Sequence, residues 1–195
     1  MAELPPLCQS RSVQGRELPR LLVVGCGNPL AGDDSAGVEI VRRLENRSDP
    51  ALQDQFRTVP SAGVALLETF SAADVVLFID AVSSGAPPGT LHLVPLLPGE
   101  IEPRALGSLS SHGWGLPETL ELARSLGRRV PNLMLLGVEV GEVSPGASRS
   151  HAVEQTITLV VEQFPRLQSL LVDSASLAWR LPHRFLPGSN CFLEE

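Results

Sequence analysis

The stretch that most constrains this chain is Leu21–Glu39, LLVVGCGNPLAGDDSAGVE. An apolar run stops at a glycine-rich turn, and apolar residues at helical spacing then continue from Ser35 to about Asn46. Strand, glycine turn and helix in this order form the first half of a βαβ unit. The turn also carries two adjacent carboxylates, Asp33 and Asp34. What this turn is built to hold is therefore the central question for function.

Strand-like and helix-like segments alternate along the rest of the chain. Short apolar runs of the kind found in buried parallel strands are separated by segments with helical spacing. Strands are predicted at 20–26, 56–59, 74–80, 90–96 and 132–140, and helices at about 35–46, 62–71, 116–126 and 150–171. The alternating run at 90–96 is expected at a sheet edge. This pattern predicts an α/β fold, a single three-layer α/β/α domain with a mostly parallel, doubly wound sheet.

Composition along the chain predicts the limits of the domain and excludes some classes of binding partner. The predicted domain covers residues 20–173, between a flexible N-terminal extension (1–19) and a Pro-rich C-terminal tail (174–195). A net charge of −7 argues against binding to nucleic acid or to an acidic membrane surface. No secretory signal or membrane-length apolar run is visible, and the three scattered cysteines form no disulfide framework. We therefore expect a cytoplasmic protein.

Three ionisable residues fall at the carboxyl ends of predicted strands, where ligands bind in sheets of this kind. Asp34 follows the first strand, Asp80 ends the third, and His112 lies in the loop after the fourth. Two carboxylates and an imidazole suit a divalent ion such as Ni²⁺ or Zn²⁺, and they equally suit acid–base chemistry on a bound water. Among the other histidines, His92 is expected to point outward, and His151 at a helix start is the only rival.

Each member of this trio also has a purely structural interpretation. Either Asp33 or Asp34 fits the N-cap of the first helix, where negative charge is favoured. We assign the cap to Asp33 and the ligand role to Asp34, although the reverse stays open. Asp80 fits a turn, but a carboxylate after five apolar residues is costly to bury unpaired. A loop histidine such as His112 is commonly just solvated.

The glycine turn also raises a nucleotide-binding interpretation. The run Gly25-Cys26-Gly27-Asn28-Pro29-Leu30 lacks the third glycine of a dinucleotide fingerprint, and no P-loop lysine follows. Asp33 and Asp34 stand where a pyrophosphate would dock, and they would repel it. Cys26 is a poor candidate nucleophile because it ends a buried strand with no adjacent base. We therefore expect no nucleotide cofactor.

The same residues resemble a known family. The motif Gly25-x-Gly27-Asn28-Pro29-Leu30-x-Gly32-Asp33-Asp34-x-x-Gly37-Val38 is similar to the opening motif of the hydrogenase maturation endopeptidases. The similarity continues in order through VLFIDAV at 76–82, Gly89-Thr90, SHGWGL at 111–116 and LLGVE at 135–139. It covers roughly residues 20–165.

The resemblance implies a phosphorylase/hydrolase-like fold and a monomeric, aspartyl-type endopeptidase. Such an enzyme activates a NiFe hydrogenase by trimming the C-terminal extension of its large-subunit precursor after nickel insertion. By motif position, Asp34, Asp80 and His112 are then both the catalytic and the metal-binding residues. The metal expected is nickel carried by the substrate, and the plainest mechanism is attack of water on a metal-polarised carbonyl with a carboxylate as base.

One departure from the family pattern bears on activity. Many members carry Asp-Gly-Gly-Thr after the second strand, and that Asp is a candidate catalytic residue. The corresponding stretch here is Thr58-Val59-Pro60-Ser61. Three interpretations stay open: catalysis does not need this carboxylate, Asp33 replaces it, or this member has changed activity. Two alternative functions therefore stay open: a metal-sensing protein that docks the large subunit without cutting it, and a nucleotide-binding α/β enzyme.

Overall fold

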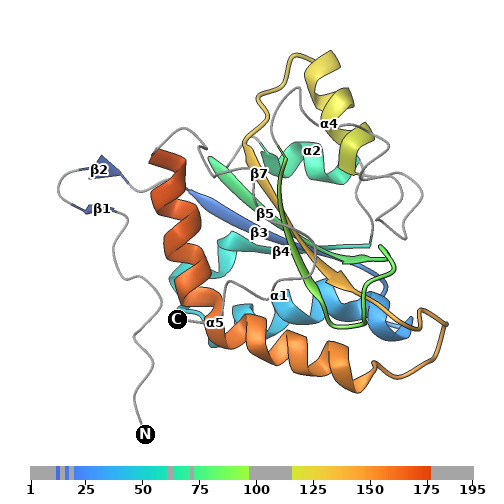
Figure 1. Cartoon of the computed structure of the whole chain (residues 1–195). Helices are drawn as coiled ribbons and strands as arrows, with labels where there is room; N and C mark the ends of the chain where they lie inside the picture. The colour runs from blue at the N-terminus through green and yellow to red at the C-terminus, as the bar shows by residue number, and fades with distance from the viewer. Residues whose placement is uncertain are drawn as a thin grey trace, which may run out of the picture.

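A mostly parallel, five-stranded sheet forms the centre of the protein, with strand order β4-β3-β5-β7-β6 (Figure 1). The computed structural model describes residues 12–13, 16–17, 20–60, 64–70, 73–96 and 116–176. The strands of the sheet are β3 (Leu21–Cys26), β4 (Phe56–Val59), β5 (Val75–Val82), β6 (Leu91–Leu96) and β7 (Asn132–Glu139). The edge strand β6 runs antiparallel to β7, and the other neighbours in this sheet run parallel. The predicted edge position of this strand is confirmed.

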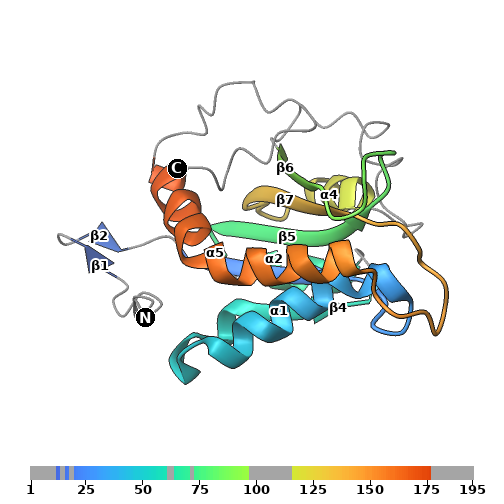
Figure 2. The same cartoon turned by 60° about the horizontal axis from the view of Figure 1, so that its bottom comes forward.

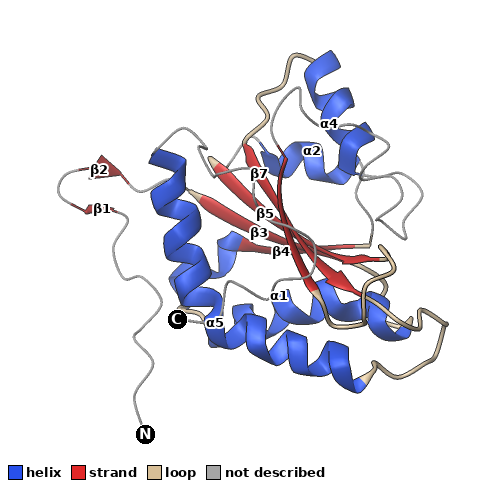
Figure 3. Ribbon diagram, viewed as in Figure 1, coloured by secondary structure: helices blue, strands red, loops and turns tan. Residues whose placement is uncertain are grey.

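Helices cover both faces of the sheet, which confirms the three-layer α/β prediction. Figures 1 and 3 show α1 (Ala36–Arg47) and α5 (His151–Ser176) on one face, and α2 (Val64–Phe70) and α4 (Leu116–Ser125) on the other. Within the described ranges, no helix has the length and apolar character needed to cross a bilayer.

Alternation along the strands divides the apolar interior into two cores. Val23 and Leu77 pack on the side of α1 and α5, whereas Val24 and Phe78 pack on the side of α2 and α4. Figure 2 shows the face of the sheet that α1 and α5 cover, with α5 passing in front of the strands. Each central strand is thus buried on both faces, which is why its sequence is a continuous apolar run rather than an alternating one.

Two elements run further than the sequence predicts. Strand β5 continues to Val82, so Asp80 lies inside the strand and pairs with Gly137 of β7. Helix α5 continues to Ser176, past the predicted tail boundary at 174, although Pro165 lies within it. Figure 1 shows this helix bending part-way along, which is expected where a proline removes a helical hydrogen bond.

Four further short elements were not predicted. The 3₁₀ helix η1 (Gly32–Ser35) precedes α1, and a second one, η2 (Pro50–Gln55), precedes β4. Asp49 caps η2 by accepting a hydrogen bond from the Ala51 N–H. Strands β1 (Ser12–Val13) and β2 (Arg16–Glu17) form a separate antiparallel pair inside the predicted N-terminal extension.

Two glycines allow α1 to cross the sheet at very short range. A Cβ atom added to Gly25 of β3 would lie 2.2 Å from the carbonyl oxygen of Gly37 in α1. A Cβ atom added to Gly37 would lie 2.4 Å from the carbonyl oxygen of Ile79 in β5. A side chain at either position would therefore overlap main-chain atoms. The start of α1 rests on the backbone of both strands, and this places η1 at the carboxyl edge of the sheet.

Candidate functional site

The segments that carry Asp34 and Asp80 meet at the carboxyl edge of the sheet. Asp34 belongs to η1, which follows β3 and packs against β5. Asp80 directly follows Ile79, the strand residue that touches the first turn of α1. The fold therefore brings together the two segments that hold two of the three predicted site residues, at the edge where ligands bind in sheets of this type.

Both carboxylates are buried, with Asp34 only 5% and Asp80 only 3% exposed. Oδ2 of Asp34 accepts a hydrogen bond from the Asn28 N–H at 2.9 Å, and Oδ1 of Asp80 accepts one from the Ala81 N–H at 2.9 Å. Burying an acid is costly unless partners satisfy it. Two buried acids on adjoining segments at a ligand-binding edge make this the candidate functional site.

The glycine turn shapes the approach to Asp34. Gly27 adopts a φ of 139°, and a Cβ atom added to it would lie 2.0 Å from the carbonyl oxygen of Asp34. The turn therefore folds directly back onto η1, which brings the Asn28 N–H to the Asp34 carboxylate. In this structure the glycine turn helps to place the carboxylate of Asp34.

The third predicted ligand, His112, lies outside the described residues, as does Ser61. Within the described ranges, no group of three or more His, Cys, Asp or Glu side chains is arranged to hold a metal ion. The complete trio of Asp34, Asp80 and His112 therefore stays a prediction. The rival His151 is exposed at the first position of α5, and Cys26 is completely buried.

The prediction that Asp33 caps the first helix is wrong. Neither η1 nor α1 has a side-chain hydrogen bond at its N-cap. The Asp33 carboxylate instead accepts hydrogen bonds from the Gly141 N–H at 3.0 Å and from the Ser150 N–H at 2.6 Å. The two adjacent acids thus have different surroundings: Asp33 joins a distant loop, whereas Asp34 accepts from the turn after β3.

A further buried carboxylate, Glu139, ends β7 at the same edge and was not predicted to be a site residue. It is 1% exposed and accepts hydrogen bonds from the Ser84 N–H at 2.7 Å, the Ser84 hydroxyl at 2.8 Å and the Gly85 N–H at 2.9 Å. Nε2 of His92 lies 3.0 Å from its Oε2. The prediction that His92 points outward is therefore wrong, because its ring turns in to this carboxylate.

These contacts decide the ionisation of Glu139. Burial is the largest single influence and favours the neutral acid, but the hydrogen bonds from Ser84, Gly85 and His92 together outweigh it. The pKa of Glu139 is consequently lowered below its ordinary value. One sequence signal pointed to this residue: like Asp80, it is an acid that directly follows a buried apolar run.

The fold and the site together define an α/β enzyme domain with an acidic carboxyl edge. Comparison with known proteins then gives the family: the model for hydrogenase maturation protease matches residues 38–166. The chain belongs to the hydrogenase maturation protease family, which confirms the resemblance and the predicted enzyme class, a peptidase.

Individual relatives agree with this assignment. The chain is 33% identical to the hydrogenase expression/formation protein HupD of Thiocapsa roseopersicina, over 86% of this chain and 79% of that protein. It is also 33% identical to the hydrogenase 2 maturation protease of Escherichia coli, over 74% of this chain and 87% of that protein. Among solved structures, the hydrogenase maturating endopeptidase HybD from E. coli superposes with a TM-score of 0.63 at 30% identity, covering 77% of this chain and 93% of that one.

Proposed function

We propose that this protein is an endopeptidase that removes the C-terminal extension from the large-subunit precursor of a NiFe hydrogenase once nickel has been inserted. Membership of the maturation protease family supports the reaction class. The observation that carries the proposal for the site is the pair of buried carboxylates, Asp34 and Asp80, on adjoining segments at the carboxyl edge. We expect the protein to act as a monomer in the cytoplasm.

Nickel enters this proposal as part of the substrate. Two carboxylates from Asp34 and Asp80 and an imidazole from His112 form a mixed oxygen and nitrogen donor set, which suits a borderline divalent ion. These residues would bind the nickel of a loaded precursor and so distinguish it from an empty one. The bound ion supplies polarisation of the scissile carbonyl.

The protein's own residues then handle the protons of hydrolysis. A water molecule adds its oxygen to the carbonyl carbon, and a carboxylate of the site accepts the proton that this water loses. The same proton passes to the leaving amide nitrogen as the carbon–nitrogen bond breaks. Water is thereby divided between the new carboxyl terminus and the new amino terminus, and no further reactant is needed.

A second candidate, a docking protein that senses nickel without cutting, is favoured by one observation. The position where many relatives carry an acid is Thr58, which is exposed on the edge strand β4 and pairs with Gly25. If catalysis needs a carboxylate from that strand, this chain lacks it there. The two candidates predict the same partner and differ only in whether the peptide bond is broken.

One experiment separates these candidates. Purified protein is incubated with nickel-loaded precursor and with nickel-free precursor, and the large subunit is followed by intact-mass spectrometry. We expect a mass loss equal to the C-terminal extension with the loaded precursor alone. A stable complex without any mass change would contradict the peptidase proposal and favour the docking protein.

Isosteric variants test the site itself. We expect Asp34→Asn and Asp80→Asn each to slow cleavage by about a hundredfold or more, the scale of losing an acid–base group. The control is Glu118→Gln, which removes an exposed carboxylate on α4 and should leave the rate unchanged. Near-normal cleavage by both aspartate variants would show that the site lies elsewhere.

A further inference from the structure

We propose that Asp33 is a positioning residue, which holds Asp34 in place by tying η1 to the β7–α5 loop (residues 140–150). This inference rests on the proposed function, because it takes Asp34 to be a site residue. Its basis is geometric: the residues on either side of Asp34 both bind the same distant loop through their side chains. Asp34 itself accepts a hydrogen bond from a different segment, the turn after β3.

The first anchor is the Asp33 carboxylate, which is completely buried. Its Oδ2 accepts from the Gly141 N–H at 3.0 Å and its Oδ1 from the Ser150 N–H at 2.6 Å. These two donors lie near opposite ends of the β7–α5 loop. One side chain therefore bridges the two ends of the loop and fastens both to η1, with charge-assisted hydrogen bonds of the stronger kind.

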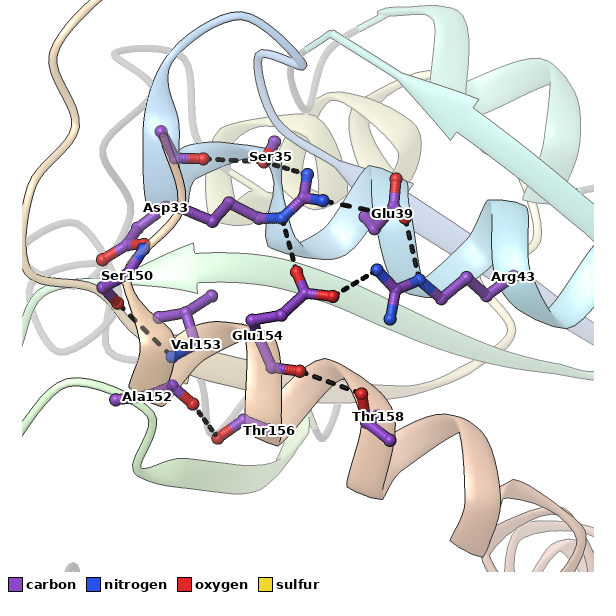
Figure 4. A network of polar contacts seen from close by, with 12 residues as sticks. Asp33, Ser35, Glu39, Arg43, Ser150, Ala152, Val153, Glu154, Thr156 and Thr158 are labelled. Carbon is purple, nitrogen blue, oxygen red and sulfur yellow. Dashed lines mark hydrogen bonds and ion pairs between the residues drawn. The ribbon is translucent and has the colours of Figure 1, made fainter. Parts of the chain in front are cut away.

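The second anchor is Ser35, on the other side of Asp34. Arg149 of the β7–α5 loop donates from Nη1 to the Ser35 hydroxyl at 3.1 Å. The same guanidinium also binds Glu154 of α5, at 2.9 Å from its Nε, and approaches Glu39 of α1. Figure 4 shows the Glu39 side chain also reaching Arg43 of the same helix. Glu154 in turn pairs with Arg43 of α1. This network joins α1 to α5 and, through Arg149, connects both helices to η1.

Main-chain contacts keep the two segments in register. The Asp33 N–H donates to the Glu142 carbonyl at 3.1 Å, and the Gly146 N–H donates to the Leu30 carbonyl at 2.7 Å. Gly32 adopts a φ of 56°, and a Cβ atom added to it would lie 2.8 Å from the Glu142 carbonyl oxygen. The turn at Leu30–Asp33 and the β7–α5 loop are therefore joined through their backbones, and the Asp33 carboxylate adds a side-chain attachment.

The attachment of η1 to the β7–α5 loop through Asp33 needs a carboxylate rather than an amide. Each oxygen of Asp33 accepts one N–H, whereas asparagine offers one acceptor oxygen and one donor NH₂ group. In Asp33→Asn the NH₂ group would face a backbone N–H, so that one of the two attachments is lost while the size of the side chain is kept. The expected effect is greater freedom of η1 without loss of the fold.

The test compares Asp33→Asn with the matched variant Asp74→Asn. Asp74 also accepts a backbone N–H, that of Arg20 at 3.0 Å, and it binds Arg129, but it precedes β5 at the opposite, amino edge of the sheet. Both variants are expected to lower the melting temperature. Only Asp33→Asn is expected to disturb the carboxyl edge, which separates positioning from general stability.

Two quantities are measured at a temperature at which both variants are still folded. The first is hydrogen exchange of the Asn28 amide, which donates to Asp34 and so reports the position of that carboxylate without reference to activity. The second is kcat/KM for nickel-loaded precursor. We expect Asp33→Asn to speed Asn28 exchange and to lower kcat/KM, each by about tenfold, the lower end of the range for groups that support metal ligands. Asp74→Asn should leave both readouts at their wild-type values.

The outcomes are distinguishable. Wild-type exchange of Asn28 and wild-type kcat/KM in Asp33→Asn would overturn the positioning role, as would equal effects in Asp74→Asn. If wild-type protein cuts no precursor while Asp33→Asn still speeds Asn28 exchange, the proposed function fails but the positioning of Asp34 by Asp33 holds.

Discussion

Replacing Glu139 with glutamine tests how firmly one buried carboxylate fixes the β5–β6 loop (residues 83–90). The two oxygens of Glu139 serve Ser84, through its N–H and hydroxyl, the Gly85 N–H and the His92 ring. Glutamine has nearly the same volume and keeps one acceptor oxygen, so the variant loses charge rather than packing. The wild-type and variant proteins therefore differ mainly in the strength of these four contacts.

The magnitude follows from the number of contacts. A hydrogen bond to a charged group contributes about 1.5–3 kcal/mol, and a neutral one about 0.5–1.5 kcal/mol. Allowing for partial compensation by the glutamine amide, Glu139→Gln is expected to lower the free energy of unfolding by about 2–3 kcal/mol. For a chain of this size, that corresponds to a fall in melting temperature of about 5–10 °C.

The pH dependence has a defined sign. Burial opposes ionisation of Glu139, but its hydrogen bonds outweigh burial and lower its pKa below the ordinary value of 4.5. A group whose pKa is lower in the folded than in the unfolded protein stabilises the fold above the unfolded value, and this contribution is lost as the pH falls through the folded pKa. The difference between wild type and Glu139→Gln should therefore be full at pH 7 and shrink below pH 4.5.

Thermal unfolding followed by calorimetry between pH 7 and about pH 3.5, a range that spans the ordinary carboxyl pKa, checks this expectation. Glu118→Gln, which changes an exposed acid on α4, is the control and should show little difference from wild type at any pH. A melting temperature for Glu139→Gln within about 1 °C of wild type at pH 7 would refute the estimate. A difference that stays constant from neutral to acid pH would refute the assignment of the effect to ionised Glu139.

Two further substitutions probe the frame around the site. Gly37→Ala places a methyl group 2.4 Å from the Ile79 carbonyl oxygen. We therefore expect the free energy of unfolding, measured in urea, to fall by about 3 kcal/mol or more. A fall of less than about 1 kcal/mol would contradict the close crossing. Glu154→Gln weakens the pairing of Glu154 with Arg43 and Arg149. Because these side chains are partly exposed, we expect the free energy of unfolding to fall by about 1 kcal/mol, and this effect should diminish in high salt. An effect that does not depend on salt would show that it comes from packing instead.

The sequence was sufficient to predict which segments form strands and which strands are buried on both faces, because such a strand is a continuous apolar run. The end of β5 was not accessible. Asp80 looked like a strand terminator, yet the ladder with β7 continues to the pair Val82 and Glu139. A polar side chain at a sheet edge does not interrupt backbone pairing when the neighbouring strand continues beside it.

The roles of the acids show the same limit more clearly. An N-cap is a local structure, so the sequence around Asp33 suggested one. Its actual donors, Gly141 and Ser150, lie 108 and 117 residues further along the chain. Glu139 likewise accepts from Ser84, 55 residues away. Long-range contacts of this kind depend on how the loops close over the sheet, which local spacing does not encode.

At the close crossing of Gly25 and Gly37, the position of α1 depends less on the packing of the apolar core, although these two properties usually change together. The height of α1 above the sheet is fixed by main-chain atoms, at positions where no side chain fits. The large apolar residues further along the helix can therefore change in size with less effect on the place of η1. Redesign of the apolar cores for heat resistance is therefore expected to disturb the site least when these two glycines are kept as a fixed pair.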